Sequence, residues 1–167
     1  MSVAILHLLR DPSLGDLDFR KPGAVLAELN QRYQMKSNND LYFTLWYGVY
    51  RPADRQLTYG CAGHPPALLV RHGEIQLLKA AGGPIGLRAG TTVAPEQVTV
   101  PEGSRLFLFS DGAFEVQRSD GSMMQLDDLL QFVSGHNSDL DRLYQQLVDA
   151  RGSTGLEDDF AIVRFAF

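Results

Sequence analysis

The stretch from Arg105 to Gly112, RLFLFSDG, constrains the fold of this chain more than any other feature. Its first half is an uninterrupted apolar run, Leu106 to Phe109, which is typical of a β-strand that is covered on both faces. A Ser-Asp-Gly turn signal follows at once. The sequence therefore predicts a buried strand over 105–110 with the carboxylate of Asp111 at its end, although an Asp-Gly pair most often only shapes a turn.

A second group of carboxylates precedes the last apolar stretch of the chain. Asp158 and Asp159 lie directly before residues 160–167, FAIVRFAF, whose composition is typical of a strand. If this strand and 105–110 are antiparallel neighbours, the end of one lies beside the start of the other. The carboxylates of Asp111, Asp158 and Asp159 would then converge and require a cation, for which oxygen ligands favour Mg²⁺ or Mn²⁺. The alternative is two unrelated polar turns.

Composition limits the class of protein. A length of 167 residues with 44% hydrophobic residues predicts a single domain, 1–167, with a sizeable core. The net charge of −5 and the lack of a basic run argue against a nucleic-acid partner. One cysteine, Cys61, cannot form an internal disulfide, which agrees with a cytoplasmic location. No apolar run approaches the ~20 residues of a transmembrane helix, so we expect no membrane partner.

Periodicity predicts a group of strands between helices, and hence an α+β domain. The helices are expected at 1–10, 22–33, 126–133 and 140–151, with Ser138 or Asp139 capping the last. Besides 105–110 and 160–167, the strands are expected at 41–50, 56–61, 67–71, 74–79 and 91–100. The first four of these five are expected to form an antiparallel meander.

Cys61 and His64 form a Cys-x-x-His pair, which would suit a thiol nucleophile beside its base. A cysteine at the end of a strand, before a Pro-Pro turn, is more often a small core residue. Two ligands do not make a zinc site. We therefore expect Cys61 to be a packing residue.

Four segments in this order make the sequence recognisable: FTLWYGVYRPADRQLTYGCAGHPPALLV, GGPIGL, PEGSRLFLFSDGAFE and LEDDFAIVRF. Over nearly the whole chain they resemble the metal-dependent protein phosphatases of the SpoIIE/RsbU type, the bacterial branch of the PPM family. The resemblance implies two packed antiparallel β-sheets flanked by helices, an αββα sandwich. It also implies hydrolysis of phosphoserine or phosphothreonine on proteins with two Mn²⁺ or Mg²⁺ ions.

The resemblance places Asp111 and Asp158 on metal-ligand positions, with Asp159 beside the second. Gly112, the last residue of the SDG motif, is assigned to the cofactor site with them. The family's first motif, which carries a bridging aspartate, would lie just upstream of the helix expected at 1–10. The expectation is therefore an N-terminally truncated domain that is a poor phosphatase by itself, because two close dications repel without a bridging anion.

Two hypotheses follow from the resemblance. The first is a phosphatase that dephosphorylates an anti-anti-sigma-type phosphoprotein, as the output domain of a response regulator. An upstream receiver or coiled-coil domain and a homodimer are compatible with it. The second is a non-catalytic adaptor of the same fold that binds a sigma-factor-control protein, as the output domains of RssB-like response regulators do. The presence of both Asp111 and Asp158 favours the enzyme, because an adaptor has no need of paired carboxylates.

Overall fold

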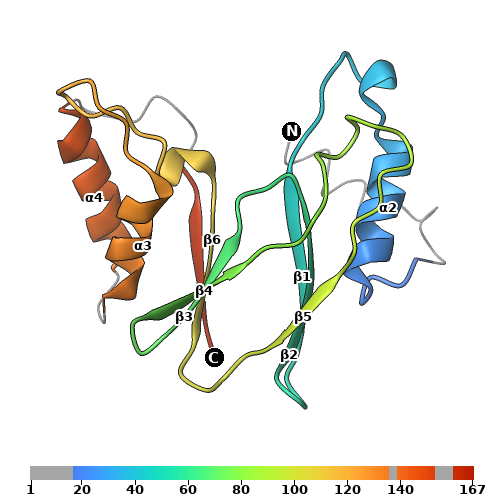
Figure 1. Ribbon diagram of the computed structural model, residues 1–167, viewed down its shortest axis with the longest axis horizontal. Coiled ribbons are helices and arrows are strands. Elements are labelled where there is room, and N and C mark those ends of the chain that lie inside the picture. The colour runs from blue at the N-terminus through green and yellow to red at the C-terminus, as the bar shows by residue number, and fades with distance from the viewer. Residues whose placement is uncertain (1–16, 136–138, 153–159) are drawn as a thin grey trace. The chain divides into compact units, whose positions relative to one another are not determined.

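The computed structural model describes residues 17–135, 139–152 and 160–167 (Figure 1). The helix expected at 1–10 lies outside these residues. The helices are α2 (Pro22–Arg32), the single turns η2 (Met35–Ser37) and η3 (Asp111–Ala113), α3 (Leu126–Ser134) and α4 (Leu140–Arg151). The strands are β1 (Leu45–Arg51), β2 (Gln56–Ala62), β3 (Ala67–Arg71), β4 (Glu74–Leu78), β5 (Glu96–Thr99), β6 (Arg105–Phe109) and β7 (Ile162–Ala166).

The strands form two antiparallel sheets, of order β1-β2-β5 and β4-β3-β6-β7. The expected α+β fold, with two antiparallel sheets and flanking helices, is confirmed. Of the expected meander, the β1–β2 and β3–β4 hairpins are confirmed, but the pairing between them is wrong, because β2 and β3 belong to different sheets. Between them lie Gly63, at a φ of +71°, and then Pro65 and Pro66, which have no N–H for a ladder. The chain therefore leaves one sheet and starts the next.

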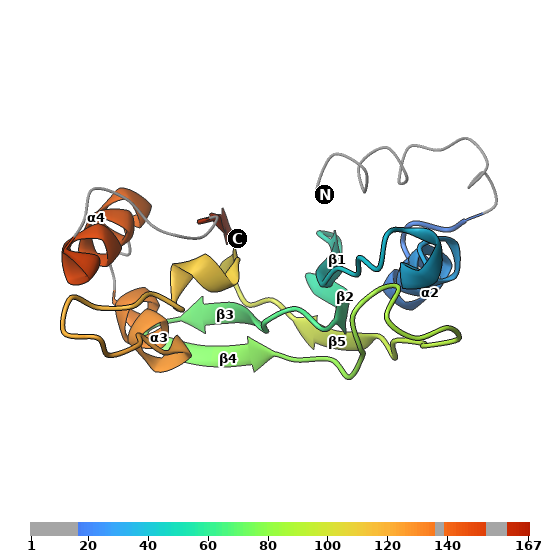
Figure 2. The ribbon, with the colours of Figure 1, turned by 90° about the horizontal axis from the view of Figure 1, so that it is seen from above.

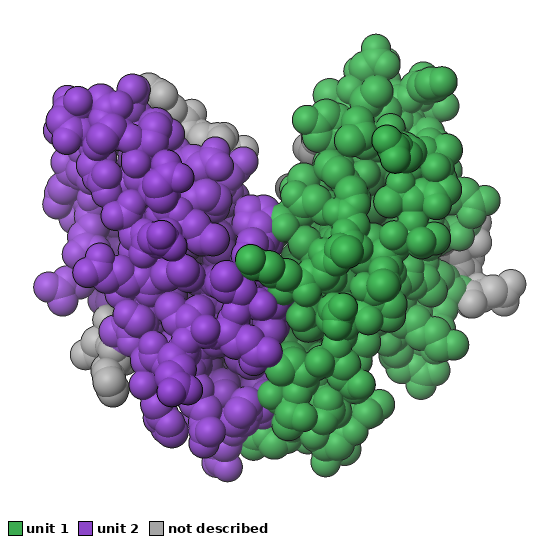
Figure 3. Space-filling view, in the orientation of Figure 1, with its two compact units in different colours: residues 1–64, 79–99 green, residues 65–78, 100–167 purple. Residues whose placement is uncertain are grey.

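Contacts divide the chain into two compact units, which Figure 3 colours separately. The first comprises residues 1–64 and 79–99 and contains the three-stranded sheet and α2. The second comprises residues 65–78 and 100–167 and contains the four-stranded sheet, α3 and α4. Within the part of the chain that the structure describes, no helix is long and apolar enough to cross a membrane.

The first unit is built on the contact between α2 and its sheet. Pro22 starts the helix, where the first N–H groups have no partner within the helix, so its missing N–H costs nothing. Val25, Leu26 and Leu29 are at most 1% exposed. Gly60 of β2 permits the close approach, because a Cβ there would lie 2.7 Å from Cδ1 of Leu26. The helical spacing of the apolar residues at 22–33 therefore predicted this element correctly.

Two strands of the first unit are shorter than expected. β1 begins at Leu45 rather than at residue 41, and before it only Phe43 pairs, in an isolated bridge to Ile85. β5 begins at Glu96 rather than at residue 91. Pro95 stands directly before it and has no N–H to donate. Local composition favours a strand in both regions, but a partner strand is present only for part of each.

The core of the second unit surrounds β6. Phe107 is fully buried, and its strand runs between β3 and β7, with Leu68 and Arg164 as its register partners. The same core holds residues of β3, β6, α3 and α4, and both helices lie on one side of this sheet (Figures 1 and 2). Leu106, Phe107 and Phe109 are buried, so the expected buried strand is confirmed.

Helix α4 is fixed at both ends and along one face. Asp139 caps it, since its Oδ1 accepts the N–H of Asp141 at 3.0 Å, while Ser138 lies outside the described residues. Gly152 ends it in the left-handed conformation, at a φ of +71°. Leu143 and Leu147 are buried against the core. These contacts hold the helix firmly on the sheet.

Cys61 is a packing residue in β2. Its side chain is 5% exposed, and its thiol donates to the carbonyl oxygen of His64 at 2.9 Å. Burial raises the pKa of the Cys61 thiol above its ordinary value of 9.0. A buried thiol with a raised pKa is a poor nucleophile, because the thiolate is the reactive form.

Replacing Cys61 by Ala is therefore expected to lower the free energy of unfolding by only about 1–2 kcal/mol, the loss of one small buried group. The thiol of the unfolded chain has the lower pKa, so it ionises first as the pH rises. The stability that the neutral, buried thiol confers is therefore fully present below pH 9.0 and is lost as the pH rises above it. Cys61→Ala should lack this alkaline loss. Urea unfolding at pH 7 and pH 10 measures both effects, and a loss of folding on substitution would contradict the assignment.

Candidate metal-binding site

The predicted pairing of the two acid-bearing strands is confirmed. β6 and β7 are antiparallel neighbours, with register partners from Arg105 and Ala166 to Phe109 and Ile162. In Figure 1, η3 at the end of β6 lies beside the start of β7. The chain segment that bears Asp111 and the segment that leads into β7 therefore meet at one edge of one sheet.

Ser110 fixes this junction. Its N–H donates to the carbonyl oxygen of Ala161 at 2.9 Å, and its Oγ accepts the N–H of Ala161, also at 2.9 Å. Asp111 is the next residue after Ser110, and Ala161 lies two residues after Asp159. Asp158 and Asp159 are outside the described residues, so their convergence with Asp111 stays a prediction.

The carboxylate of Asp111 is held by the turn that it begins. Its Oδ1 accepts the N–H of Gly112 at 3.0 Å, while its backbone oxygen accepts from Phe114 at 2.9 Å and from Glu115 at 2.8 Å. Asp111 is exposed, whereas Gly112 is buried. Asp111 therefore presents a carboxylate to solvent in a restricted orientation. Gly112 orients it through its own N–H, and its expected assignment to the cofactor site is not tested.

The residues at this edge suit a hard cation by donor type. Carboxylate oxygens are the usual ligands of Mg²⁺ and Mn²⁺. Across residues 17–135, 139–152 and 160–167, no three His, Cys, Asp or Glu side chains gather closely enough to hold a metal ion. A complete ligand set at Asp111 therefore needs groups beyond these residues, and Asp158 and Asp159, just before Phe160, stay the predicted ones.

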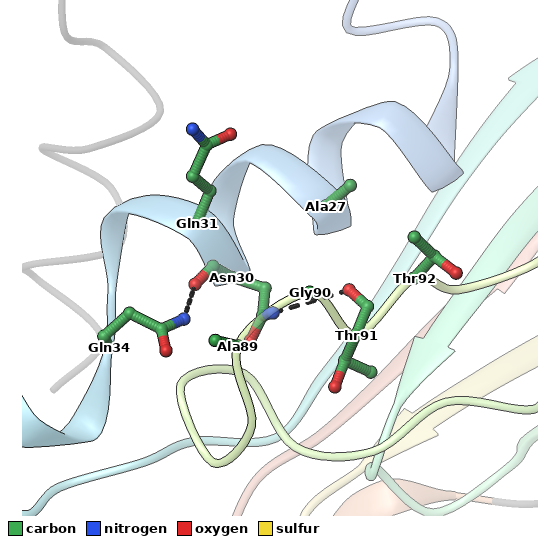
Figure 4. A pocket seen from close by; sticks show the side chains of 8 residues that line it. All are labelled: Ala27, Asn30, Gln31, Gln34, Ala89, Gly90, Thr91 and Thr92. Carbon is green, nitrogen blue, oxygen red and sulfur yellow. Dashed lines mark hydrogen bonds between the residues drawn. The ribbon is translucent and has the colours of Figure 1, made fainter.

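A pocket of about 330 Å³ in the first unit has a different character (Figure 4). No lining residue carries a charge, and the set comprises Ala27, Asn30, Gln31, Gln34, Ala89, Gly90, Thr91 and Thr92. Neutral amides and hydroxyls are poor ligands for a divalent cation by themselves. This pocket is therefore not the candidate metal site.

Asn30, on the wall of this pocket, is 2% exposed and joins α2 to the loop that follows Ile85. Its Nδ2 donates to the carbonyl oxygens of Arg88 at 3.0 Å and Thr91 at 3.4 Å, and its Oδ1 accepts the N–H of Gly86 at 2.8 Å. Sequence reasoning missed this residue. The available signal was one amide next to Leu29, on the apolar face of the predicted helix.

Asn30→Ala is expected to lower the free energy of unfolding by about 2–3 kcal/mol, because the N–H of Gly86 and the carbonyl of Arg88 lose a buried partner. Gln31→Ala, an exposed change one residue away, is the matched control and should change it by no more than about 0.5 kcal/mol. Urea titrations compare the two. Equal effects would show that the Asn30 hydrogen bonds contribute nothing.

Comparison with family models identifies the sequence. The model of stage II sporulation protein E (SpoIIE) matches residues 1–167. The chain belongs to the SpoIIE family. No curated protein matches it. The family assignment confirms the resemblance carried by the four sequence segments, and it brings the SDG and EDD motifs into the context of a phosphatase family.

Solved structures share the fold. The SiaA-PP2C domain of Pseudomonas aeruginosa is 20% identical with a TM-score of 0.78, over 92% of this chain and 64% of that chain. The PP2C phosphatase domain of SpoIIE from Bacillus subtilis, with a fragment of its regulatory domain, is 20% identical with a TM-score of 0.76, over 95% of this chain and 48% of that chain. RsbX in complex with magnesium is 17% identical with a TM-score of 0.64, over 98% of this chain and 70% of that chain. The chain thus spans less than two thirds of the first two.

Proposed function

We propose that this chain is a metal-dependent phosphatase domain that removes phosphate from serine or threonine of a bacterial signalling phosphoprotein. The observation that carries the proposal is the junction of Ser110 with Ala161, because it joins the segment of Asp111 to the segment that follows Asp159. Membership of the SpoIIE family supports the reaction class. An anti-anti-sigma-type substrate and a place in a response regulator are part of the proposal.

Asp111, Asp158 and Asp159 are proposed to hold Mn²⁺ or Mg²⁺. When bound, such an ion lowers the pKa of a coordinated water and stabilises negative charge on the phosphoryl oxygens. The contribution of the chain is geometric. Ser110, the residue before Asp111, binds Ala161, which follows Asp159 by two residues, and the N–H of Gly112 restricts the carboxylate of Asp111. Each hydrogen bond reduces the conformational entropy that the site would lose when the ion binds.

A covalent phosphocysteine is not part of the proposal. Cys61 is the one cysteine of the sequence, and it is buried with its thiol donating to a carbonyl oxygen. A buried thiol with a raised pKa does not attack phosphorus readily. Water is therefore the proposed nucleophile.

The test is hydrolysis of a phosphoserine protein by the purified chain with Mn²⁺, with Mg²⁺ and with excess chelator, alongside Asp111→Asn. The proposal expects phosphate release that needs the metal and Asp111. Slow release is expected, because three carboxylates supply few of the six or so ligands that two ions each prefer. Binding of a sigma-control protein that is equal in both variants, without metal-dependent phosphate release, would favour the adaptor instead.

A further inference from the structure

The turn η3, which begins with Asp111, is too short to hold itself in place. It comprises three residues, and a single turn fixes several backbone dihedral angles in return for few hydrogen bonds. Asp111 is exposed, so burial of its side chain does not orient the carboxylate. The orientation of this carboxylate therefore depends on how firmly the residues on either side hold the turn.

The residue in the capping position of this turn is engaged elsewhere. Ser110 is the N-cap, a position from which a serine side chain commonly accepts an N–H of the first turn. Its side chain makes no such hydrogen bond here, because its Oγ accepts the N–H of Ala161 at 2.9 Å. Ser110 thus joins two neighbouring segments of the sheet, and the turn is held in another way.

Two phenylalanine rings hold the turn from both sides. Phe109 lies directly before the N-cap and Phe114 directly after the turn, and their rings pack edge to face with centroids 5.9 Å apart and planes at 86°. An apolar pair at these two positions is a hydrophobic staple, which fixes the direction in which the chain enters the turn. Phe109 is 3% exposed, so its ring is a firm support, and Phe114 is half-buried against the same core.

Phe114 is also joined to Asp111 through the backbone. Its N–H donates to the carbonyl oxygen of Asp111 at 2.9 Å, and the N–H of Glu115 donates to the same oxygen at 2.8 Å. We infer that Phe114 is a positioning residue for Asp111, whose ring keeps the turn closed so that the carboxylate keeps the orientation in which it binds a cation. The inference rests on the proposed function.

The size of the effect follows from the ring contact. An edge-to-face pair favours the conformation that contains it by a factor of roughly two to twelve. The apparent affinity for a ligand falls in proportion to the population of the conformation that binds it. Ala113 and Val116 are buried and hold the turn in part, so loss of the Phe114 ring should weaken metal binding by roughly two- to tenfold.

The experiment measures Mn²⁺ affinity by electron paramagnetic resonance of the free ion, for the wild type and for Phe114→Ala, Phe114→Tyr, Phe132→Ala and Asp111→Asn. Phe132 is the matched control, because it is a half-buried phenylalanine of α3 that packs against the same core. Phe114→Ala should bind Mn²⁺ roughly two- to tenfold more weakly. Phe114→Tyr keeps the ring, and Phe132→Ala leaves the staple intact, so both should match the wild type.

Hydrogen exchange without metal gives a second readout. The N–H groups of Gly112 and Glu115 report on the turn, since one donates to the carboxylate and the other to the carbonyl oxygen of Asp111. Both should exchange faster in Phe114→Ala and stay unchanged in Phe132→Ala. Circular dichroism sets a temperature at which every variant is folded. Phe114→Leu, which keeps an apolar side chain but has no ring, takes the place of Phe114→Ala if that variant does not fold.

The outcomes separate the inference from the proposed function. If Asp111→Asn loses Mn²⁺ binding and Phe114→Ala does not, the proposed function stands and the inference is wrong. Equal weakening in Phe114→Ala and Phe132→Ala means a general loss of core packing and also overturns the inference. If the wild type and Asp111→Asn bind Mn²⁺ equally, the proposed function fails, and the inference fails with it.

Discussion

Asp111→Asn is expected to reduce Mn²⁺-dependent phosphate release by at least about a hundredfold. The change removes one negative charge but keeps an oxygen that can accept the N–H of Gly112, as Oδ1 does at 3.0 Å. The turn should therefore persist, and the loss should come from metal binding. The measurement is kcat/KM for a phosphoserine protein over a range of Mn²⁺ concentrations. A deficit that high Mn²⁺ partly restores would assign the effect to affinity.

Asp149→Asn is the matched control for this prediction. Asp149 is an exposed aspartate near the C-terminal end of α4, whose Oδ1 accepts from Gln145 at 2.8 Å. An amide oxygen can take over that hydrogen bond, and loss of a negative charge near a helix C-terminus is neutral or slightly favourable. Activity should stay at the wild-type level. A similar decrease in both variants would show that Asp111 has no special part.

Phe107→Ala should have the largest effect on stability, lowering the free energy of unfolding by about 3–5 kcal/mol. Phe107 is fully buried at the centre of β6, and the guanidinium carbon of Arg105 lies 5.8 Å from its ring centroid. Truncation removes buried area and leaves a cavity between β3, β7 and the helices. This loss is a large part of the stability of a typical domain, about 5–15 kcal/mol.

Phe165→Ala is the comparison, because it removes the same side chain from β7, where it is 47% exposed. It should cost less than about 1 kcal/mol. Urea unfolding followed by circular dichroism gives both values. If the free energy of unfolding falls with urea concentration at a different slope in one variant, that variant has also changed the compactness of the unfolded state. Equal costs for the two phenylalanines would mean that β6 is not the centre of the second core.

Elements whose physical cause lies in neighbouring residues were predicted well from the sequence. The apolar run 106–109 predicted a buried strand because two covered faces remove alternation, and Phe107 at zero exposure agrees. The helix at 140–151 was predicted with both its bounds, and Asp139 is one of the two caps expected for it, since its cap and its apolar spacing are local. The pairing of β6 with β7 also followed, because the acidic groups suggested where the strands meet.

The second neighbours of β2 and β3 were not predictable in the same way. A meander is the shortest connection of four consecutive strands, yet besides their hairpin partners β2 pairs with β5 and β3 with β6, which lie further along the chain. Asn30 has its hydrogen-bond partners in the loop at 86–91, and Ser110 has its partner at Ala161. No local spacing encodes such contacts. For the same reason the sequence predicted Asp111 as a candidate ligand but did not predict the hydrogen bonds of Ser110 beside it.

The alternation of the chain between the two units affects how it folds. The backbone passes from one unit to the other after residue 64, returns after residue 78 and crosses again after residue 99. The β3–β4 hairpin is local, with the left-handed pair His72 and Gly73 as its turn, and it can form early. Leu68, however, must wait for Phe107 to be brought beside it. Pairings between strands so far apart in the sequence slow folding, because the loop between them must close first. No single cut separates the chain into two pieces that each carry one whole unit.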